Sequence, residues 1–185
     1  MSREGPVELR PTKSDLVIAR AAARMATPDR QRALRLVTLL ADEKAVLAVA
    51  AAVWLASRYS RQSQDRKEAD RMMCSVLAAG AVPHLFKFLV RRKRPDRSFG
   101  HKNGIARSGD AWDSFPSGHA VHLAAMAPSA SRLAPRSLRP LVWPAVLSLA
   151  ATRILILAHY PSDVIAGLGI GVAIDKAIAA ALRAR

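Results

Sequence analysis

Residues 141–158 read LVWPAVLSLAATRILILA, and Arg153 is the one charged side chain in that stretch. A bilayer core takes about 20 apolar residues, and Arg or Lys near the end of a segment can extend its charge to the headgroups. Four further segments are similarly apolar: residues 45–57, 72–90, 120–134 and 164–182. The pattern predicts an all-α integral membrane protein with about five transmembrane helices in a bundle. The dense polar run RYSRQSQDRKEADR, residues 58–71, is interpreted as a connecting loop.

The segment before residue 45 has an amphipathic pattern instead of a uniformly apolar one. Residues 14–25, SDLVIARAAARM, put small apolar side chains on one helical face and Arg20 and Arg24 on the other, with Ser14 as the expected N-cap. Thr27 and Pro28 predict a second helix start. Basic amphipathic helices of this kind lie at membrane interfaces. The chain is therefore divided into an N-terminal amphipathic, interfacial segment, residues 1–44, and a transmembrane domain, residues 45–185.

Composition limits the function classes. The 185 residues include 29 basic and 14 acidic side chains, for a formal charge of +15. A hydrophobic content of 51% argues against a disordered basic tail, and the single Cys74 excludes a disulfide framework or a multi-cysteine metal site. The charge favours a polyanionic partner, either nucleic acid or a membrane surface. A soluble basic helical bundle that binds nucleic acid is the alternative from a different class.

Three charged motifs fall at the ends of the predicted helices. In a five-helix chain, the helix ends near Arg94, Ser117, His159 and Asp163 all lie on one face of the membrane. Lys87 and Arg94 are seven residues apart, which is two turns and hence one face if the helix continues. Charges scattered at random would rarely meet this topological condition. The ends therefore predict one polar site at one end of the bundle.

The residue types at these ends fit phosphoryl transfer. Pro116-Ser117-Gly118-His119 opens a helix, where free N–H groups and the helix dipole favour an anion. Lys and Arg neutralise the charge on phosphoryl oxygens. A neutral histidine can attack phosphorus when a carboxylate orients it, and the spacing of His159 and Asp163 allows that contact across the intervening turn. A second histidine can protonate the leaving group.

The ordered set K-x6-R-P, P-S-G-H and T-R-x5-H-x3-D resembles the type 2 phosphatidic acid phosphatase superfamily, over about residues 87–171. That superfamily includes membrane lipid phosphatases and vanadium haloperoxidases. The resemblance implies His159 as nucleophile, Asp163 as its orienting partner and His119 as general acid. It also implies phosphate binding by the following residues: Lys87, Arg94, Ser117, Gly118 and Arg153. Thr152 stands where the family usually has Ser, and membrane members often have six spans where this chain shows five.

Side chains near the motifs are predicted to anchor the helices at the membrane or to contact the headgroup. Arg91, Arg92 and Lys93 are interpreted as a membrane-flanking anchor cluster. The loop before Pro116 overhangs the predicted site, and His122 lies one turn beyond His119. Candidate headgroup contacts are Lys102, Trp112, Asp113 and His122.

The predicted function is a phosphatase of the cell (inner) membrane. It is expected to hydrolyse a lipid phosphomonoester or diphosphate, such as a phosphatidate-like lipid, a polyprenyl (di)phosphate or a phosphorylated polyprenyl sugar, through a phosphohistidine. The resemblance implies no metal and no other cofactor; the expected partners are the lipid phosphate and the bilayer, without nucleic acid. The excess of basic residues on the active-site face slightly favours a location of that site on the cytoplasmic side.

Alternatives stay open on the sequence alone. A lipid phosphotransferase would use the same residues to pass the phosphoryl group to an alcohol. A vanadium haloperoxidase would bind vanadate in the same clamp, although the small size and the apolar segments argue against it. The oligomeric state is left open.

Overall fold

The computed structural model describes residues 6–99 and 110–184, most of which are helical. The helices and strands are β1 (Val7–Glu8), α1 (Lys13–Met25), α2 (Pro28–Thr38), the short 3-10 helix η1 (Leu39–Ala41), α3 (Glu43–Ser57), α4 (Ser63–Leu89), β2 (Val90–Arg91), α5 (Pro95–Phe99), α6 (Gly118–Leu133), α7 (Arg139–Leu155) and α8 (Pro161–Arg183). All five apolar segments expected to be helical are so, as α3, α4, α6, α7 and α8.

The prediction of a loop over residues 58–71 is wrong from Ser63 onward, because α4 begins there. Neighbouring helices hold the polar side chains of this part of α4. Asp70 accepts hydrogen bonds from Arg58 and from the Trp54 indole, both at 2.7 Å, and Glu68 pairs with Arg132 at 2.8 Å. The charges that resembled a solvated loop therefore join α4 to α3 and to the end of α6.

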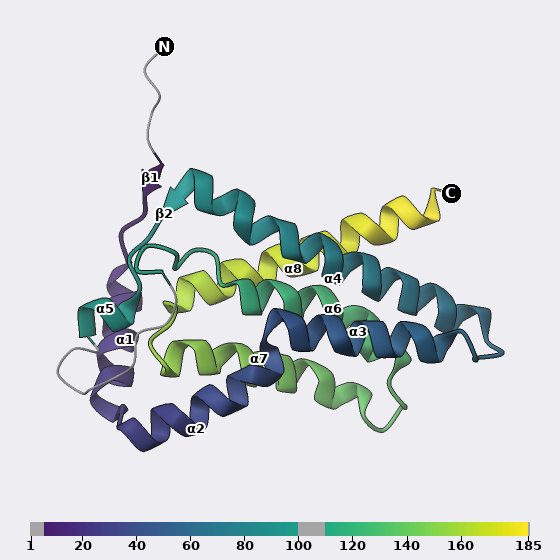
Figure 1. The fold of residues 1–185 in the computed structure, drawn as a ribbon, viewed down its shortest axis with the longest axis horizontal. Helices are drawn as coiled ribbons and strands as arrows, with labels where there is room; N and C mark the ends of the chain where they lie inside the picture. The colour runs from purple at the N-terminus through teal and green to yellow at the C-terminus, as the bar shows by residue number, and fades with distance from the viewer. Residues whose placement is uncertain (1–5, 100–109, 185) are drawn as a thin grey trace, which may run out of the picture.

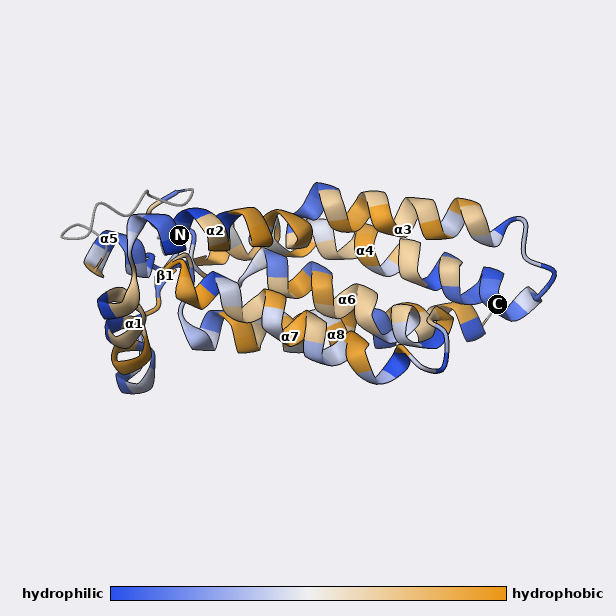
Figure 2. Ribbon diagram, turned by 90° about the horizontal axis from the view of Figure 1, so that it is seen from below, coloured by the Kyte–Doolittle hydropathy of each residue, from blue (hydrophilic) through white to orange (hydrophobic). Residues whose placement is uncertain are grey.

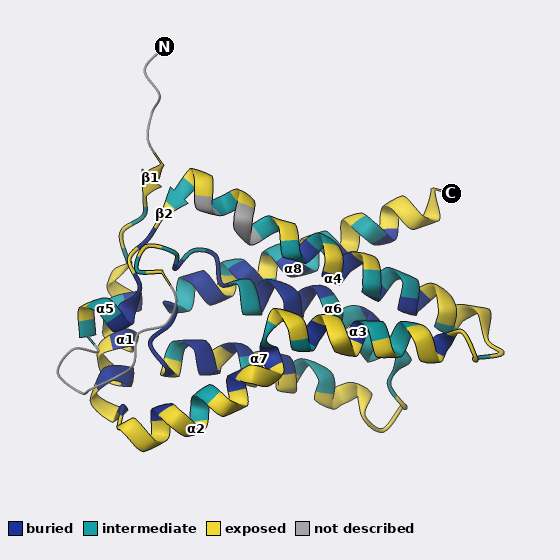
Figure 3. Ribbon diagram, in the orientation of Figure 1, coloured by how far each residue is buried: buried dark blue, intermediate teal, exposed yellow. Residues whose placement is uncertain are grey.

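The long helices form an elongated bundle, with α6 in its interior (Figures 1 and 3). Every residue from Ala120 to Ala125 is buried. The largest apolar cluster joins α6 to its neighbours through Met72, Val76, Leu123 and Val146. Viewed from below, α3 and α4 lie above α6, α7 and α8 (Figure 2). The start of α6 is therefore enclosed on several sides.

Two glycines one turn apart set the close approach of α8 to α6. A Cβ atom on Gly171 would lie 2.3 Å from the Val121 carbonyl oxygen, and one on Gly167 would lie 2.7 Å from that of Ser117. Small residues at this spacing let helix backbones come together. The contact fixes the start of α8 beside the start of α6, where the Ser117 N–H donates to the Asp163 carbonyl oxygen at 3.1 Å.

Within the N-terminal segment, α1 packs across the end of the bundle (Figure 2) and α2 packs against α7. Thr12, rather than the predicted Ser14, is the N-cap of α1, because its hydroxyl accepts from the Asp15 N–H while Asp15 accepts from the Thr12 N–H. The predicted start of α2 at Thr27 and Pro28 is confirmed. Ahead of α1, β1 pairs in parallel with β2. The amphipathic pattern of α1 is also confirmed, since its alanine face is buried while Arg20 and Arg24 are exposed.

Within the described residues, α8 is the one helix that is long and apolar enough to cross a membrane. The helices α3, α6 and α7 have 15, 16 and 17 residues, at or below the usual minimum for a span. The helical bundle is thus established, whereas the number of membrane crossings stays a prediction.

Candidate active site

The ends of α4, α6, α7 and α8 that carry the three motifs converge at one end of the bundle, as predicted. A cavity of about 200 Å³ opens there. It is lined by Asp42, Glu43, Gly80, Arg94, Asp113, Pro116, Gly118, His119, His122, Arg153 and His159. Residues from all three motifs therefore share a single cavity.

A tight turn after α7 places His159 in this cavity. The Leu157 backbone adopts a left-handed conformation, with φ of 58°, although its side chain is fully buried. Most L-residues avoid that region at a cost of about 1–2 kcal/mol. The Ala158 and His159 N–H groups both donate to the Arg153 carbonyl oxygen, at 3.0 and 3.2 Å. The turn thereby fixes the imidazole relative to the last turn of α7.

The hydrogen bonds of His159 define its tautomer. Nδ1 lies 2.6 Å from the Ser114 carbonyl oxygen, which can only accept, so Nδ1 carries the proton. Nε2 then carries the free lone pair, 3.5 Å from Nη1 of Arg94. Burial, followed by the charges of Arg94 and Arg153, lowers the pKa of His159 well below its ordinary value. The imidazole is therefore neutral, with its proton on Nδ1 and its free lone pair on Nε2.

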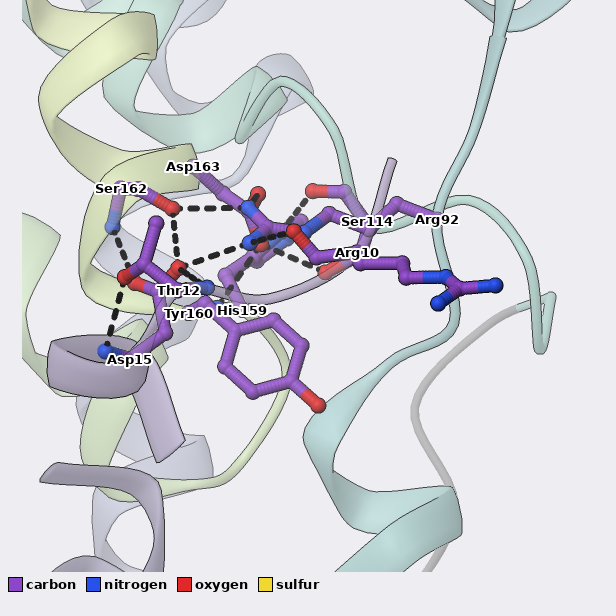
Figure 4. Close-up of polar contacts among 9 residues, drawn as sticks. All are labelled: Arg10, Thr12, Asp15, Arg92, Ser114, His159, Tyr160, Ser162 and Asp163. Carbon is purple, nitrogen blue, oxygen red and sulfur yellow. Dashed lines mark hydrogen bonds and ion pairs between the residues drawn. The ribbon is translucent and has the colours of Figure 1, made fainter. Parts of the chain in front are cut away.

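Asp163 contacts His159 indirectly, which corrects the expected carboxylate–imidazole contact. The Asp163 carboxylate accepts from the Ser114 hydroxyl at 2.6 Å and from the Tyr160 N–H at 2.8 Å, and it pairs with Arg92 (Figure 4). Ser114 thus contacts His159 through its carbonyl and Asp163 through its hydroxyl. The Asp163 carboxylate thereby holds Ser114 and the turn at Tyr160, which lie next to His159.

Arg92 belongs to this network and not to a membrane anchor. Its side chain is 3% exposed and pairs with the buried carboxylates of Asp163 and Asp15, the latter at 2.7 Å. It also donates to the Ser162 hydroxyl at 2.7 Å (Figure 4). The sequence did not reveal this role, because Arg92 stands among three other cations. Arg91 and Lys93 are exposed, as an anchor role requires.

Asp15 is the second residue that sequence reasoning missed. It is 1% exposed and accepts hydrogen bonds from Arg92, Thr12 and both donor groups of Ser162. Burial raises the pKa of Asp15, but the bonds from Ser162, Thr12 and Arg92 outweigh it and lower the pKa to about 2. The Thr-x-x-Asp spacing was a readable capping signal. Nothing in the sequence linked Asp15 to a turn 147 residues away.

Of the residues predicted to bind phosphate, Arg94, Gly118 and Arg153 line the cavity. Arg94 is fixed by bonds from Nε to the Asp110 carbonyl at 2.9 Å and from Nη1 to the Ala158 carbonyl at 3.2 Å. Arg153 is buried, and within the described chain its Nε has no hydrogen-bond partner. The same holds for the buried Ser117 hydroxyl. These donors fit an anion such as phosphate.

The remaining candidates divide into three groups. His119, His122, Gly118 and Asp113 line the cavity. Trp112 instead packs against the Arg91 guanidinium, 5.6 Å from its ring centre. Lys102 and the side chain of Lys87 lie outside the described residues. Across the described residues, no cluster of three or more His, Cys, Asp or Glu side chains is arranged to hold a metal ion.

Comparison with known proteins identifies the class to which this fold and site belong. A family model for the PAP2 superfamily matches residues 69–185, which is more than half of the chain. The chain therefore belongs to the PAP2 superfamily, and the resemblance carried by the three motifs is confirmed. The matched region contains α6, α7, α8 and every motif residue.

Two curated relatives are phosphatases. A lipid A 1-phosphatase of Rhizobium etli is 37% identical over 103 residues, covering 54% of this chain and 44% of the relative. A decaprenylphosphoryl-5-phosphoribose phosphatase of Mycobacterium tuberculosis is 35% identical over 105 residues, covering 56% of this chain and 55% of the relative. The chain thus spans about half the length of each of these relatives.

Solved structures share the fold. A transmembrane PAP2-type phosphatidylglycerolphosphate phosphatase from Bacillus subtilis superposes with a TM-score of 0.66 at 16% identity, covering 90% of this chain and 83% of that one. Aquifex aeolicus LpxE gives a TM-score of 0.64 at 16% identity, covering 88% of this chain and 93% of that one. The fold of this chain therefore matches that of both structures, and the match extends into the region before residue 69.

Proposed function

We propose that this chain is a membrane phosphatase that hydrolyses a lipid phosphomonoester or diphosphate through a phosphohistidine on His159. The observation that carries the proposal is the shared cavity, in which His159 and His119 lie with Arg94 and Arg153. Membership of the PAP2 superfamily and the phosphatase names of the relatives support the same reaction.

The proposed reaction has two steps. Nε2 of His159 attacks phosphorus, the bond to the leaving oxygen breaks, and His119 donates a proton to that oxygen. Arg94 and Arg153 stabilise the charge that develops on the phosphoryl oxygens. Water then attacks the phosphohistidine while His119 accepts a proton, which releases inorganic phosphate and restores His159.

The chain's own hydrogen bonds support His159 in this role. Phosphorylation at Nε2 makes the imidazole cationic, and Nδ1–H keeps its acceptor at the Ser114 carbonyl. The Asp163 carboxylate, held against the Ser114 hydroxyl, adds negative charge nearby. Ser114 and Asp163 together stabilise the cationic phosphohistidine much as a buried carboxylate stabilises an imidazolium.

We further propose that the bundle crosses the cell membrane several times, with the N-terminal segment at the interface and the active site leaning toward the cytoplasmic side. Large apolar side chains stay exposed on α3, α4, α7 and α8, including Leu55, Phe88, Leu147 and Ile165. Leu36, Leu39 and Leu40 are exposed on the N-terminal segment. Retention in carbonate-washed membranes is the expected result, and extraction without detergent would contradict it.

Phosphate release from lipid phosphates by the purified protein tests the activity. His159→Ala and His119→Ala are expected to lower the rate by at least about 100-fold. Acid-labile labelling of the wild type by a 32P-phosphorylated lipid, lost in His159→Ala, would identify the intermediate. Full activity of either variant would overturn the mechanism. Transfer of phosphate to an added alcohol in preference to water would identify the phosphotransferase instead.

A further inference from the structure

One wall of the cavity is unsuited to phosphate. Glu43, at the first turn of α3, places its carboxylate Oε1 3.9 Å from Nε2 of His122. Asp42, the N-cap of α3, lines the same cavity. A carboxylate repels a phosphate dianion, and the two cations that fit the phosphate, Arg94 and Arg153, come from other elements. The wall formed by Glu43 and His122 therefore has a different ligand chemistry.

His122 is a hydrogen-bond acceptor on this wall. Its Nδ1 lies 2.9 Å from the Gly118 carbonyl oxygen, so in the neutral ring Nδ1 carries the proton and Nε2 carries the lone pair. The side chain is 2% exposed, and among the described residues Nε2 has no hydrogen-bond partner. Glu43, whose side chain is 56% exposed, places a second acceptor beside the buried Nε2 of His122. A buried acceptor such as this Nε2 is normally satisfied by a donor.

The position of this wall relates it to the leaving group. His122 follows His119 by three residues on α6, so both side chains face the same side of the helix. In the proposed reaction His119 protonates the leaving oxygen, and the carbon skeleton of the leaving group continues beyond that oxygen. Gly80 leaves space here, because a Cβ atom on it would lie 3.3 Å from Glu43 Oε1 and 3.8 Å from His122 Nε2.

We infer that Glu43 and His122 form a subsite for hydroxyl or amino groups next to the phosphate. The preferred substrate is therefore a lipid whose phosphorylated headgroup is a polyol or a sugar, rather than one whose phosphate is joined directly to an unsubstituted hydrocarbon or an esterified glycerol. This inference rests on the proposed function and narrows its substrate class.

The test compares two lipids with identical acyl chains in mixed micelles. Phosphatidylglycerol phosphate has a leaving group with a free hydroxyl beside the phosphate, whereas the diacylglycerol released from phosphatidic acid has none. The wild type is expected to show a higher kcat/KM for the hydroxylated lipid. Glu43→Ala is expected to reduce that preference by roughly tenfold to a hundredfold, the usual range for a hydrogen bond to a charged group.

Two further variants distinguish a specific loss of the subsite from a general loss of activity. Gly80→Ala keeps every charge and favours the helix, yet it fills the space beside both acceptors, so it should also reduce the preference. Asp29→Asn, a carboxylate exposed on α2, should leave both rates unchanged.

The outcomes are distinguishable. Equal kcat/KM for the two lipids in the wild type, or an equal loss on both in Glu43→Ala, would overturn the subsite while leaving the phosphatase activity intact. Absence of phosphate release from either lipid by the wild type would overturn the proposed function and this inference with it.

Discussion

Asp15 accepts two hydrogen bonds from Ser162, one from the backbone N–H at 3.0 Å and one from the hydroxyl at 2.7 Å. Ser162 directly precedes the buried Asp163, whose carboxylate shares Arg92 with Asp15. The first helix of the chain is therefore bonded to the start of the last one, within the network that orients His159. The N-terminal segment predicted over residues 1–44 is thus bonded through Asp15 to the predicted transmembrane domain.

Replacing Asp15 should destabilise the fold. Asp15→Ala leaves the buried Arg92 with one carboxylate in place of two and removes both acceptors of Ser162. Breaking a buried ion pair costs about 3–5 kcal/mol, and the remaining Asp163 places the expected loss at the lower end. Denaturant unfolding in detergent would measure it. Asp29→Ala, at an exposed carboxylate, should change stability by less than about 0.5 kcal/mol; equal effects of the two variants would contradict the role of Asp15.

Alanine substitutions of the three cations at positions 91–93 should differ sharply in their effect on turnover. Arg92→Ala leaves Asp15 and Asp163 buried without their shared partner, so loss of folded protein or at least about a 100-fold loss of kcat is expected. Arg91→Ala and Lys93→Ala alter exposed side chains and should retain near-normal turnover. Steady-state kinetics on all three variants would decide, and an active Arg92→Ala enzyme would exclude the network from catalysis.

The helix contact offers a test with an internal control. Gly171→Ala places a methyl group against the Val121 carbonyl and should separate α8 from α6, lowering both stability and turnover. Gly169→Ala meets nothing within 4 Å and should be neutral or slightly stabilising, because alanine favours a helix. The melting temperatures of the two variants would compare them directly. A tolerated Gly171→Ala would mean that this contact does not set the helix spacing.

The protonation state of His159 gives a pH prediction. Its lowered pKa means that the folded protein keeps the imidazole neutral where an exposed histidine, with a pKa near 6.5, becomes protonated. Histidine NMR signals in detergent should show one ring, absent in His159→Gln, that does not titrate between pH 7 and 5.5. Because only the unfolded chain gains that proton, stability should fall as the pH drops below about 6.5. A midpoint near 6.5 for this signal would refute the prediction.

The sequence predicted the helices well because they depend on local pattern, and the order and spacing of the motifs predicted that their residues meet at one end of the bundle. The apolar segments became helices, and His119, Arg94, Arg153 and His159 share the expected cavity. What the sequence could not indicate depends on tertiary pairing. Nothing in the cluster at positions 91–94 separates the buried Arg92 from its exposed neighbours.

The prediction of a loop over residues 58–71 was wrong for a related reason. Its charges are typical of a loop when read alone, but Asp70 and Glu68 have partners on other helices. The expected bond between Asp163 and His159 failed because spacing gives proximity and not the identity of the acceptor. Ser114, which belongs to none of the motifs, occupies that place.

Because its acceptor is the Ser114 carbonyl, the tautomer of His159 is insensitive to substitution of Ser114. Any residue at position 114 retains a backbone oxygen, so a single-codon change there cannot remove the acceptor that holds the proton on Nδ1. The bond to Asp163 comes from the hydroxyl and is lost as soon as Ser114 becomes alanine. A substitution of Ser114 therefore breaks the link to the Asp163 carboxylate, while the main chain keeps the tautomer of His159.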